Sequence, residues 1–354
     1  MSARIAPREG LSSLGGYHSV QVDVDVRLNT NESPYPPPPG WREAYAAAVG
    51  DVDFHRYPDR DATQLRERIG ALHGVGGDEV FCANGSNEVL QCLLLAFGGH
   101  ERRALVFEPT YTLHAHITQL TSTGLVTGGR DAGLLVDPDE ALALMARHRP
   151  EIVFLCSPNN PTGRVEAPEV VAAIVDAAPG LVVVDEAYGQ FARWSALSLR
   201  PRAAGLVVVR TFSKTWALAG ARLGYLVADA DVVAGCRAAA LPYHLSVQTQ
   251  LAGLLALDHA EEMAERVRRV ASAREHLASA LAELPVDTWP SDANFVLFRP
   301  RHPDPAAVWT SLVDEGVLIR DFSSRPGLEG CLRVTVGTPE ENARFLRALE
   351  GILT

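Results

Sequence analysis

Lys214 is the only lysine among the 354 residues of this chain, and the other 31 of its 32 basic side chains are arginines. The two side chains differ in chemistry. A desolvated ammonium group can lose its proton and attack a carbonyl to form a Schiff base, whereas a guanidinium group stays protonated. Chance could leave one lysine anywhere in so lysine-poor a chain. The surrounding segment TFSKTWALAGARLGY favours instead a lysine that acts as a covalent catalyst.

A lysine of this kind implies a carbonyl cofactor, and pyridoxal 5′-phosphate (PLP) has four requirements. It needs an anion site for its phosphate, a carboxylate beside its pyridine nitrogen, donors for its phenolic oxygen, and a flat group against its ring. For the phosphate, Ser86 and Asn87 follow Gly85 at an expected strand-to-helix turn, where free backbone N–H groups and the helix dipole favour an anion. Ser213 and Arg222 add a hydroxyl group and a bidentate cation. Ser86 as a plain helix cap and Arg222 as a surface arginine remain the alternatives.

The other three requirements are met by residues that follow apolar runs. Asp185 ends the run LVVVD, where a carboxylate is costly unless it is paired, and a pyridinium is a suitable partner. A helix cap or a structural ion pair would also explain Asp185. Asn160 and the Tyr188 hydroxyl can donate to the phenolic oxygen, and Tyr111 can lie against the ring unless it is a core tyrosine.

The elements that position these residues alternate along the chain. Residues 61–73 and 86–97 are typical of helices, and VFCANG (80–85) between them is typical of a strand. The apolar runs RALVFEPTY, EIVFLCSPNNPTG, LVVVDEAY and GLVVVRTFSK follow, with helical stretches between most of them. Strands that are apolar throughout are buried on both faces, which predicts an α/β fold with a mainly parallel sheet flanked by helices. In such sheets a ligand lies beyond the carboxyl ends of the strands, where the candidate residues fall.

The pattern changes after about residue 245, as expected for a second domain in a chain of this length. A helical region at about 246–283 precedes the strands NFVLFRP, GVLIRDF and LRVTVG, with helices expected at 303–315 and 339–350. We therefore expect a large domain at 41–245 and a smaller α+β domain at 246–354. Residues 1–40 are expected to be irregular, to end in the rigid segment SPYPPPPG, and to pack with the small domain.

Charge and composition exclude several classes of protein. The formal net charge of −11 argues against nucleic acid or an anionic membrane as a partner. There is neither an apolar run of 18 residues nor a signal-peptide core, so a cytoplasmic protein is expected. The five cysteines form no CxxC pair and are read as buried free thiols. No metal site is expected, because His114 and His116 would point to different faces of a helix.

Taken in order, CSPNNPTG, VVVDEAY and TFSKTWALAGARLGY resemble the PLP-dependent aminotransferases of fold type I. LNTNESPYPPP, RYPD, GSNEVL and GLEGCLRVTVGTPEEN resemble its histidinol-phosphate aminotransferase branch in particular. The likeness extends from about residue 11 to the C-terminus. Asn87 departs from the pattern, because the family often has aspartate there, but an amide suits a position beside a phosphate equally well.

The resemblance implies roles for individual residues. Lys214 would be the Schiff-base residue, Asp185 the pyridinium partner and Tyr188 a catalytic phenolate donor. The cofactor would also contact Ser86, Asn87, Tyr111, Asn160, Ser213 and Arg222. Tyr57 would reach the cofactor phosphate of a second subunit, so that the protein is a homodimer with shared active sites. Substrate contacts would come from Tyr17, Asn31, Arg320 and Arg333.

The resemblance also implies a reaction, the transamination of L-histidinol phosphate with 2-oxoglutarate to give imidazole acetol phosphate and L-glutamate. Arg320 and Arg325 flank the RDFSSRPG loop and could hold the substrate phosphate, although Arg325 is also explained as a solvated loop residue. Three alternatives stay open: an aromatic amino-acid aminotransferase, a PLP-dependent decarboxylase of a phosphorylated amino acid, and a PLP-binding regulatory module. The last usually carries a DNA-binding domain, for which this chain shows no segment.

Overall fold

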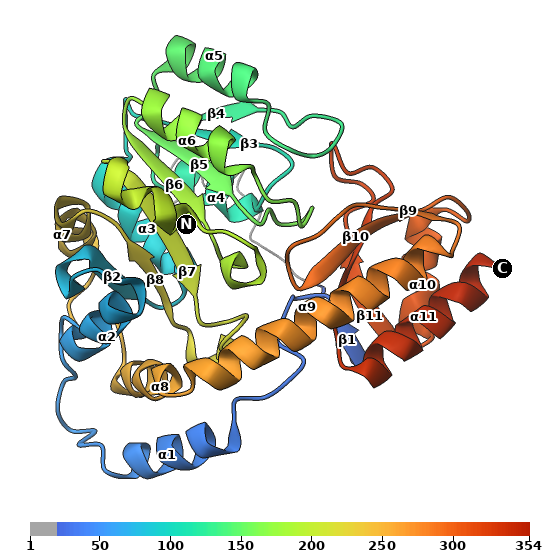
Figure 1. Ribbon diagram of the computed structural model, residues 1–354, viewed down its shortest axis with the longest axis horizontal. Helices are drawn as coiled ribbons and strands as arrows, with labels where there is room; N and C mark the ends of the chain where they lie inside the picture. The colour runs from blue at the N-terminus through green and yellow to red at the C-terminus, as the bar shows by residue number, and fades with distance from the viewer. Residues whose placement is uncertain (1–19) are drawn as a thin grey trace, which may run out of the picture.

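The computed structural model of the protein describes residues 20–354, except for the side chains at 201 and 202. Within this range the chain forms two separate β-sheets with helices packed around them (Figure 1). This arrangement confirms the predicted α/β fold with a mainly parallel sheet flanked by helices. Tyr17 lies outside the described residues.

The larger sheet has seven strands in the order β2-β8-β7-β6-β5-β3-β4. Their bounds are Val80–Ala83 (β2), Arg103–Phe107 (β3), Gly124–Gly128 (β4), Ile152–Cys156 (β5), Leu181–Asp185 (β6), Leu206–Thr211 (β7) and Gly224–Val227 (β8). β8 runs antiparallel to both of its neighbours, and the other pairs are parallel. The central strands are buried along almost their whole length, as their unbroken apolar runs predict. Their carboxyl ends therefore meet at one edge of the sheet.

Helices cover both faces of this sheet (Figure 1). The core on one face includes residues of α3 (Ser86–Phe97), α4 (Thr112–Leu120) and α7 (Ala230–Ala239). On the other face, α5 (Pro138–His148) and α6 (Pro168–Ala177) contribute to a second core. A third core joins β2 and β8 to α1 (Pro39–Gly50), α2 (Thr63–His73) and α8 (Val247–Leu257). Packing on all sides holds the strand ends, and the loops that follow them, in fixed positions.

The smaller sheet has five strands in the order β1-β11-β12-β10-β9. Their bounds are Val26–Leu28 (β1), Val286–Thr288 (β9), Phe295–Pro300 (β10), Val317–Asp321 (β11) and Leu332–Thr335 (β12). Helices α10 (Pro305–Asp314) and α11 (Pro339–Leu353) pack against it. The prediction that the first 40 residues are irregular is wrong at β1, which pairs in parallel with β11. This pairing places the N-terminal segment against the C-terminal part of the chain.

Residues 246–283, expected as one helical region, form two helices. α8 ends at Leu257, and α9 (Ala260–Ala282) starts after a break at Asp258 and His259. α9 runs from the large sheet across to the small one (Figure 1), and its buried residues Val270 and Leu277 belong to the core of the small sheet. We propose that α9 links a large domain of residues 41–245 to a small domain of residues 246–354.

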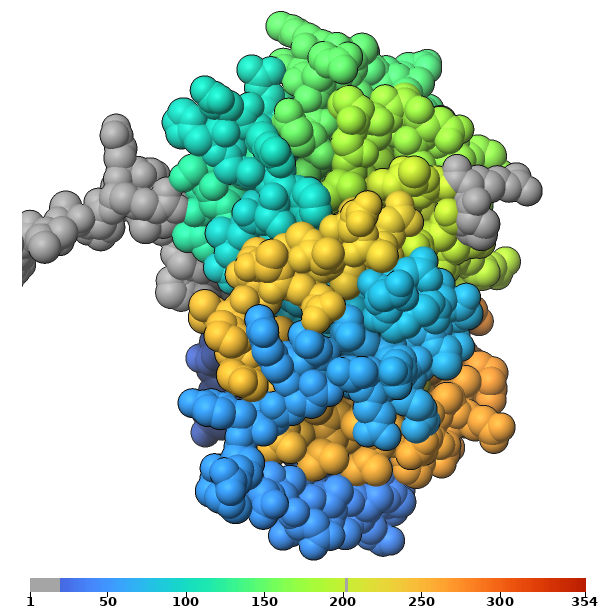
Figure 2. Space-filling model, turned by 90° about the vertical axis from the view of Figure 1, so that its left-hand side faces the viewer, coloured from blue at the N-terminus to red at the C-terminus, as the bar shows by residue number. Residues whose placement is uncertain are grey.

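Figure 2 shows a face of the molecule on which segments far apart in the sequence lie side by side. The chain around residues 230–245, in gold, lies against the chain around residues 50–75, in blue. Large apolar side chains are exposed on these two segments, among them Phe54, Tyr57, Leu241 and Tyr243. Such exposure on neighbouring segments is typical of a surface that another protein molecule covers.

Candidate active site

A cavity of about 390 Å³ lies at the carboxyl ends of β5, β6 and β7, where they meet the N-terminus of α3 and the N-terminal segment. We call it the main cavity. Most of the residues singled out in the sequence line it: Asn31, Ser86, Asn87, Tyr111, Asn160, Asp185, Tyr188, Ser213, Lys214, Arg222 and Arg333. Its volume falls in the range of about 300–1,000 Å³ that is usual for small-molecule sites.

Lys214 lies just after β7, and its Nζ donates a hydrogen bond to the carbonyl oxygen of Thr30 at 2.9 Å. Burial, together with the positive charges of Arg333 and Arg222, lowers the pKa of this amine to about 8, against an opposing effect of Glu32. A lowered pKa leaves more of the amine neutral near physiological pH. Only the neutral form can attack a carbonyl, so this site suits a nucleophilic lysine.

The turn before α3 is shaped to receive an anion. Gly85 stands at the helix cap with a φ of +81°, and no side chain caps the first turn of α3. A Cβ at Gly85 would lie 2.5 Å from Nη2 of Arg222, so glycine is needed for the guanidinium to approach the turn. A Cβ at Gly224 on β8 would clash with the backbone nitrogen of Ser86. Free N–H groups at a helix N-terminus beside an arginine form a ready-made phosphate site.

Asp185 ends β6 with its side chain almost completely buried. Its Oδ1 accepts a hydrogen bond from the backbone N–H of Ala187 at 3.0 Å, and its Oδ2 lies 2.9 Å from Nε2 of His114. The His114 ring is buried between neighbours: it stacks on Phe154 with ring centroids 4.9 Å apart and meets the edge of Tyr111. The imidazole therefore fixes the orientation of the carboxylate inside the cavity.

Tyr188 and Asn160 both line the main cavity and carry groups that can donate a hydrogen bond. The Tyr188 hydroxyl accepts a hydrogen bond from Nδ2 of Asn31 at 2.9 Å. Burial raises the pKa of Tyr188 above its ordinary value, so the hydroxyl keeps its proton and can donate it in turn. Asn160 accepts through Oδ1 from Nη1 of Arg333, which leaves its amide group to donate.

Tyr111 lies at the N-cap of α4 and donates from its hydroxyl to Oδ1 of Asn87 at 3.1 Å. Its ring is only half-buried and lines the main cavity. The contact with Asn87 ties the ring to the first turn of α3. A planar ligand held by that turn would therefore have an aromatic ring beside it, whereas a fully buried core tyrosine would not offer one.

Arg333 connects the main cavity to a smaller one of about 40 Å³, which Tyr111, Asn160, Arg320, Phe322 and Arg325 also line. Nη2 of Arg333 donates to the carbonyl oxygen of Asn29 at 2.8 Å, so this arginine, on β12, is held by the N-terminal segment. Its guanidinium carbon lies 4.9 Å from the centroid of the Phe295 ring.

Arg325 is not a solvated loop residue. Its Nη2 is 2.7 Å from Oε2 of Glu108 and donates to the carbonyl oxygen of Thr110, also at 2.7 Å. Glu108 follows β3 of the larger sheet, whereas Arg325 lies between β11 and β12 of the smaller one. The ion pair thus holds the loop after β11 against the larger sheet, next to the smaller cavity.

Tyr57 does not line the main cavity in this chain. It is 81% exposed and stacks on Tyr243 with ring centroids 4.5 Å apart. The family resemblance implies that Tyr57 reaches the active site of a second subunit, and its exposure leaves it available for that role.

The chain matches the family described as aminotransferase class I and II over residues 23–349. It is 49% identical to the histidinol-phosphate aminotransferase of Frankia casuarinae, over 98% of this chain and 90% of that protein. It is 48% identical to the enzyme of the same name from Thermobifida fusca, over 97% and 94%. The chain belongs to the aminotransferase class I and II family. It is therefore an aminotransferase, as its sequence motifs predicted.

A solved structure supports the same fold for this aminotransferase. The histidinol-phosphate aminotransferase of Sinorhizobium meliloti, determined in complex with pyridoxal 5′-phosphate, superposes with a TM-score of 0.90. The match covers 99% of this chain and 98% of that one, at 24% sequence identity. The two chains therefore share a fold over nearly their whole length.

The residues of the main cavity fit PLP. The uncapped first turn of α3, with Arg222 against Gly85, can take the phosphate, and the buried Asp185 can face the pyridine nitrogen. His114, which contacts Asp185 from behind the cavity wall, was not singled out as a site residue, since the sequence analysis considered it only as a metal ligand. Its position three residues after Tyr111, on a helix that opens at the cavity, was the signal that could have found it.

No group of three or more His, Cys, Asp or Glu side chains among residues 20–354 is arranged to hold a metal ion. No helix in the same range is both long and apolar enough to cross a membrane. All five cysteines are buried and free, as the sequence predicted.

Proposed function

We propose that this aminotransferase transfers the amino group of L-histidinol phosphate to 2-oxoglutarate in histidine biosynthesis, with PLP as cofactor. The observation that carries the proposal is that the two cavities are neighbours with shared walls. Arg333, Asn160 and Tyr111 line both, and Arg320 and Arg325 are added at the smaller one. A substrate with a phosphate group needs such cations close to the reacting centre. The names of the relatives from Frankia casuarinae and Thermobifida fusca agree with this substrate.

PLP would supply the electron sink that makes the Cα proton of the substrate acidic. Ser86, Asn87, Ser213 and Arg222 would hold its phosphate. Asp185 would keep its pyridine nitrogen protonated, because a buried carboxylate favours a positive charge beside it. Asn160 and Tyr188 would donate to its phenolic oxygen, with Tyr111 against its ring.

Lys214 would have two tasks. Its neutral amine would hold the cofactor covalently between turnovers and, once displaced by substrate, would take the proton from the substrate Cα. A pKa of about 8 suits both tasks, since the amine is then neutral often enough to accept a proton and basic enough to remove one. The carbonyl oxygen of Thr30 orients the amine toward the cavity.

Arg333 would bind an anionic group of each substrate in turn. It is almost completely buried and is fixed by Asn160 and the Asn29 carbonyl, so little side-chain entropy remains to be lost when an anion binds. Arg320 lies beside it at the smaller cavity and would add a second cation for the phosphate of histidinol phosphate. Asn31 would orient Tyr188 from the N-terminal segment.

The test compares amino donors in one assay with 2-oxoglutarate as acceptor. The purified protein should use L-histidinol phosphate with a kcat/KM at least about 100-fold higher than phenylalanine or tyrosine, because the aromatic donors leave the arginines without a partner. Equal or better use of phenylalanine would show that the protein is an aromatic amino-acid aminotransferase. Release of CO₂ from a phosphorylated amino acid, without amino transfer, would instead show a decarboxylase.

A matched variant tests the role of Arg333. Arg333→Lys should keep the cofactor spectrum while raising the KM for histidinol phosphate and for 2-oxoglutarate together, because lysine cannot form two parallel hydrogen bonds with an anion. A rise for histidinol phosphate alone would make Arg333 a dedicated phosphate clamp. Loss of cofactor binding with unchanged KM values would show that Arg333 binds the cofactor and not the substrates.

We further propose that the aminotransferase is a cytoplasmic homodimer in which Tyr57 reaches the cofactor phosphate of the partner. The exposure of Tyr57 and its stacking on Tyr243 support this. The two tyrosines belong to the segments around residues 50–75 and 230–245, which lie side by side in Figure 2. The buried free cysteines are consistent with a reducing compartment.

A further inference from the structure

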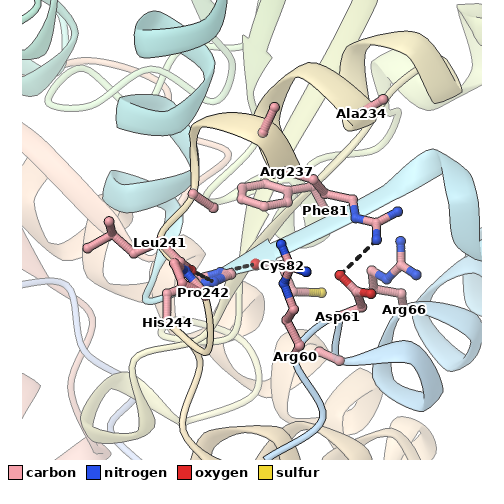
Figure 3. Close-up of a pocket in the computed structure, with 13 residues that line it drawn as sticks. Arg60, Asp61, Arg66, Phe81, Cys82, Ala234, Arg237, Leu241, Pro242 and His244 are labelled. Atoms are coloured by element: carbon pink, nitrogen blue, oxygen red, sulfur yellow. Dashed lines mark hydrogen bonds and ion pairs between the residues drawn. The ribbon is translucent and has the colours of Figure 1, made fainter.

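Arg266, in the second turn of α9, is a buried arginine to which the reaction proposed above gives no role. Several arginines of this chain face a carboxylate, as Arg237 faces Asp61 at 2.7 Å (Figure 3). Arg266 instead binds two backbone carbonyl oxygens: Nη1 donates to Thr215 at 3.0 Å, and Nη2 donates to Pro36 at 3.3 Å. Its exposed fraction is only 8%, and burial lowers its pKa. A charged side chain is costly to bury, and these two hydrogen bonds offset part of that cost.

The two carbonyl groups belong to the segments that enclose Lys214. Thr215 is its neighbour in the chain, and Pro36 belongs to the N-terminal segment, of which residues 29–32 line the main cavity. Nζ of Lys214 itself donates to the carbonyl oxygen of Thr30 in that segment, at 2.9 Å. Lys214 is thus held at its amine by one end of the segment, while Arg266 joins the other end to the backbone beside it.

The gap between these segments is closed to solvent. Val267 and Asn294 line it together with Lys214 and Arg266, and it is too small for a water molecule. Nδ2 of Asn294, just before β10, also donates to the carbonyl oxygen of Asn31 at 3.1 Å, so the small sheet holds the same segment. α9 itself runs from the large sheet to the small one (Figure 1). Arg266 therefore lies where the helix, the N-terminal segment and Lys214 meet.

We propose that Arg266 is a positioning residue for Lys214: it clamps the N-terminal segment and the backbone of Thr215 to α9, and thereby keeps the amine enclosed. The proposal rests on the role given to Lys214, but not on the identity of the amino donor. Without the clamp, the segment would move away and water would reach the amine. A solvated amine holds its proton more firmly, so less of it would be neutral for attachment of the cofactor or for removal of the substrate proton.

The pKa of Lys214 reports how well the amine is enclosed. Burial is the largest cause that lowers it to about 8, and the charges that also shift it come from Arg333, Arg222 and Glu32. Loss of enclosure should therefore raise this pKa toward the ordinary value of 10.5. Because Lys214 is the only lysine of the chain, no other side-chain amine competes in a labelling experiment.

The experiment measures the pH dependence of amine labelling in the full-length protein after removal of PLP. Only neutral amines react with dinitrofluorobenzene, and mass spectrometry of the peptide that contains residue 214 gives the labelling rate constant at each pH. The midpoint should lie at about 8 in the wild type and at least about one pH unit higher in Arg266→Met. Arg266→Gln removes the same charge but keeps a donor for one carbonyl group, so its midpoint should rise less. That difference separates the lost contact from the lost charge.

Two arginines of the same helix provide matched controls. Arg274 is equally buried, with an exposed fraction of 8%, and its Nη1 donates to the carbonyl oxygen of Ala293 at 3.1 Å. Arg274→Met should lower the melting temperature as Arg266→Met does, but it should leave the labelling midpoint at about 8. Arg268 lies on the surface and pairs with Glu265 at 2.6 Å, so Arg268→Met should change neither the melting temperature nor the midpoint.

A higher midpoint in both Arg266 variants, with the larger rise for methionine and both controls at the wild-type value, supports the proposal. Should Arg266→Met fail to fold, Arg266→Gln is compared with the two controls alone. A midpoint of about 8 in the Arg266 variants, whatever their melting temperature, would make Arg266 purely structural and overturn the proposal. Equal rises for methionine and glutamine, or an equal rise in Arg274→Met, would overturn it as well. An error in the role of Lys214 would show differently, as a borohydride-reduced PLP adduct on another peptide of the wild-type holoenzyme.

Discussion

At the scale of single residues, the reactivity of Lys214 follows from where it is buried. Removing an ammonium group from water disfavours its charge, and two nearby guanidinium groups disfavour it further. The pKa of about 8 then predicts how the apoprotein takes up PLP. The rate constant for covalent attachment should rise with pH and level off above about 8, not above the ordinary lysine value of 10.5, because only the neutral amine reacts.

Visible absorbance during mixing of apoprotein and PLP measures this profile. Lys214→Arg keeps the charge and most of the volume but cannot form the covalent bond, so it should show neither the absorbance change nor turnover. Reduction with borohydride should fix the cofactor to the peptide that contains residue 214. Two results would contradict the role given to Lys214. One is a reduced adduct on another peptide. The other is a rate constant that still rises between pH 9 and 10, as expected of an exposed amine with an ordinary pKa.

His114 supports the reaction through Asp185 and is a positioning residue. His114→Phe should keep the stacking on Phe154 but remove the hydrogen bond to the carboxylate. We expect kcat to fall roughly 10- to 100-fold, the range typical of groups that orient a functional ligand. The cofactor should stay bound, but the pH midpoint of its visible spectrum should shift, because a less firmly oriented Asp185 stabilises the protonated pyridine nitrogen less. An unchanged midpoint with reduced thermal stability would make His114 purely structural.

The residues that the sequence identified are those whose type alone limits what they can do. A sole lysine and an aspartate after four buried residues have few ordinary explanations. His114 and Arg325 were misjudged because their roles depend on partners distant in the sequence, Asp185 and Glu108, which only the packing of strands brings near. A histidine on a helix or an arginine in a loop carries no local sign of such a partner.

At the scale of elements, the N-terminal segment completes the main cavity from the side of the smaller sheet. Asn31 has a φ of +55° and joins three elements: it donates to the Tyr188 hydroxyl and accepts from Oγ1 of Thr335 on β12. Its backbone N–H also donates to Thr335, at 3.0 Å. Pairing of β1 with β11 holds this segment in place. Asparagine is one of the few residues with a side chain that tolerates such a backbone conformation.

Asn31→Ala should therefore lower the free energy of unfolding by about 2–4 kcal/mol, from lost buried hydrogen bonds and from the strain of alanine at positive φ. Asn31→Gly is the matched control, since it loses the same hydrogen bonds without the strain and should be less destabilised. Denaturant unfolding measures both variants, and kcat should fall in both because Tyr188 loses its partner. Equal stability of wild type and Asn31→Ala would show that the segment is not held through this residue.

The strands that the sequence predicted are the long apolar ones, and those it missed are short or atypical. β1 and β9 have three residues each, and β4 has only one buried residue, so neither length nor apolarity marks them. The break between α8 and α9 was also missed. It contains no proline or glycine, and Asp258 and His259 interrupt a stretch that otherwise has a helical pattern.

At the scale of the whole molecule, exposed apolar side chains gather on two neighbouring segments, and Tyr57 is among them. The exposed residues Phe54, Tyr57, Leu241 and Tyr243 belong to the segments around residues 50–75 and 230–245, which Figure 2 shows side by side. Tyr57 is not one of the residues that line the main cavity of its own chain. A symmetric dimer through this surface would cover the apolar side chains and bring each Tyr57 to the partner's site, since a two-fold interface uses the same patch twice.

Mixing two inactive variants tests the shared site. A chain with Lys214→Ala keeps Tyr57, and a chain with Tyr57→Ala keeps Lys214, so a mixed dimer has one site in which both residues are intact. Random exchange in an equal mixture makes half of the dimers mixed, and total activity should return to about a quarter of wild type. Mixing Lys214→Ala with Lys214→Arg is the control, because no arrangement of those chains completes a site. Sedimentation that shows an active monomer, or a mixture no more active than the mean of its two components, would place Tyr57 outside the active site.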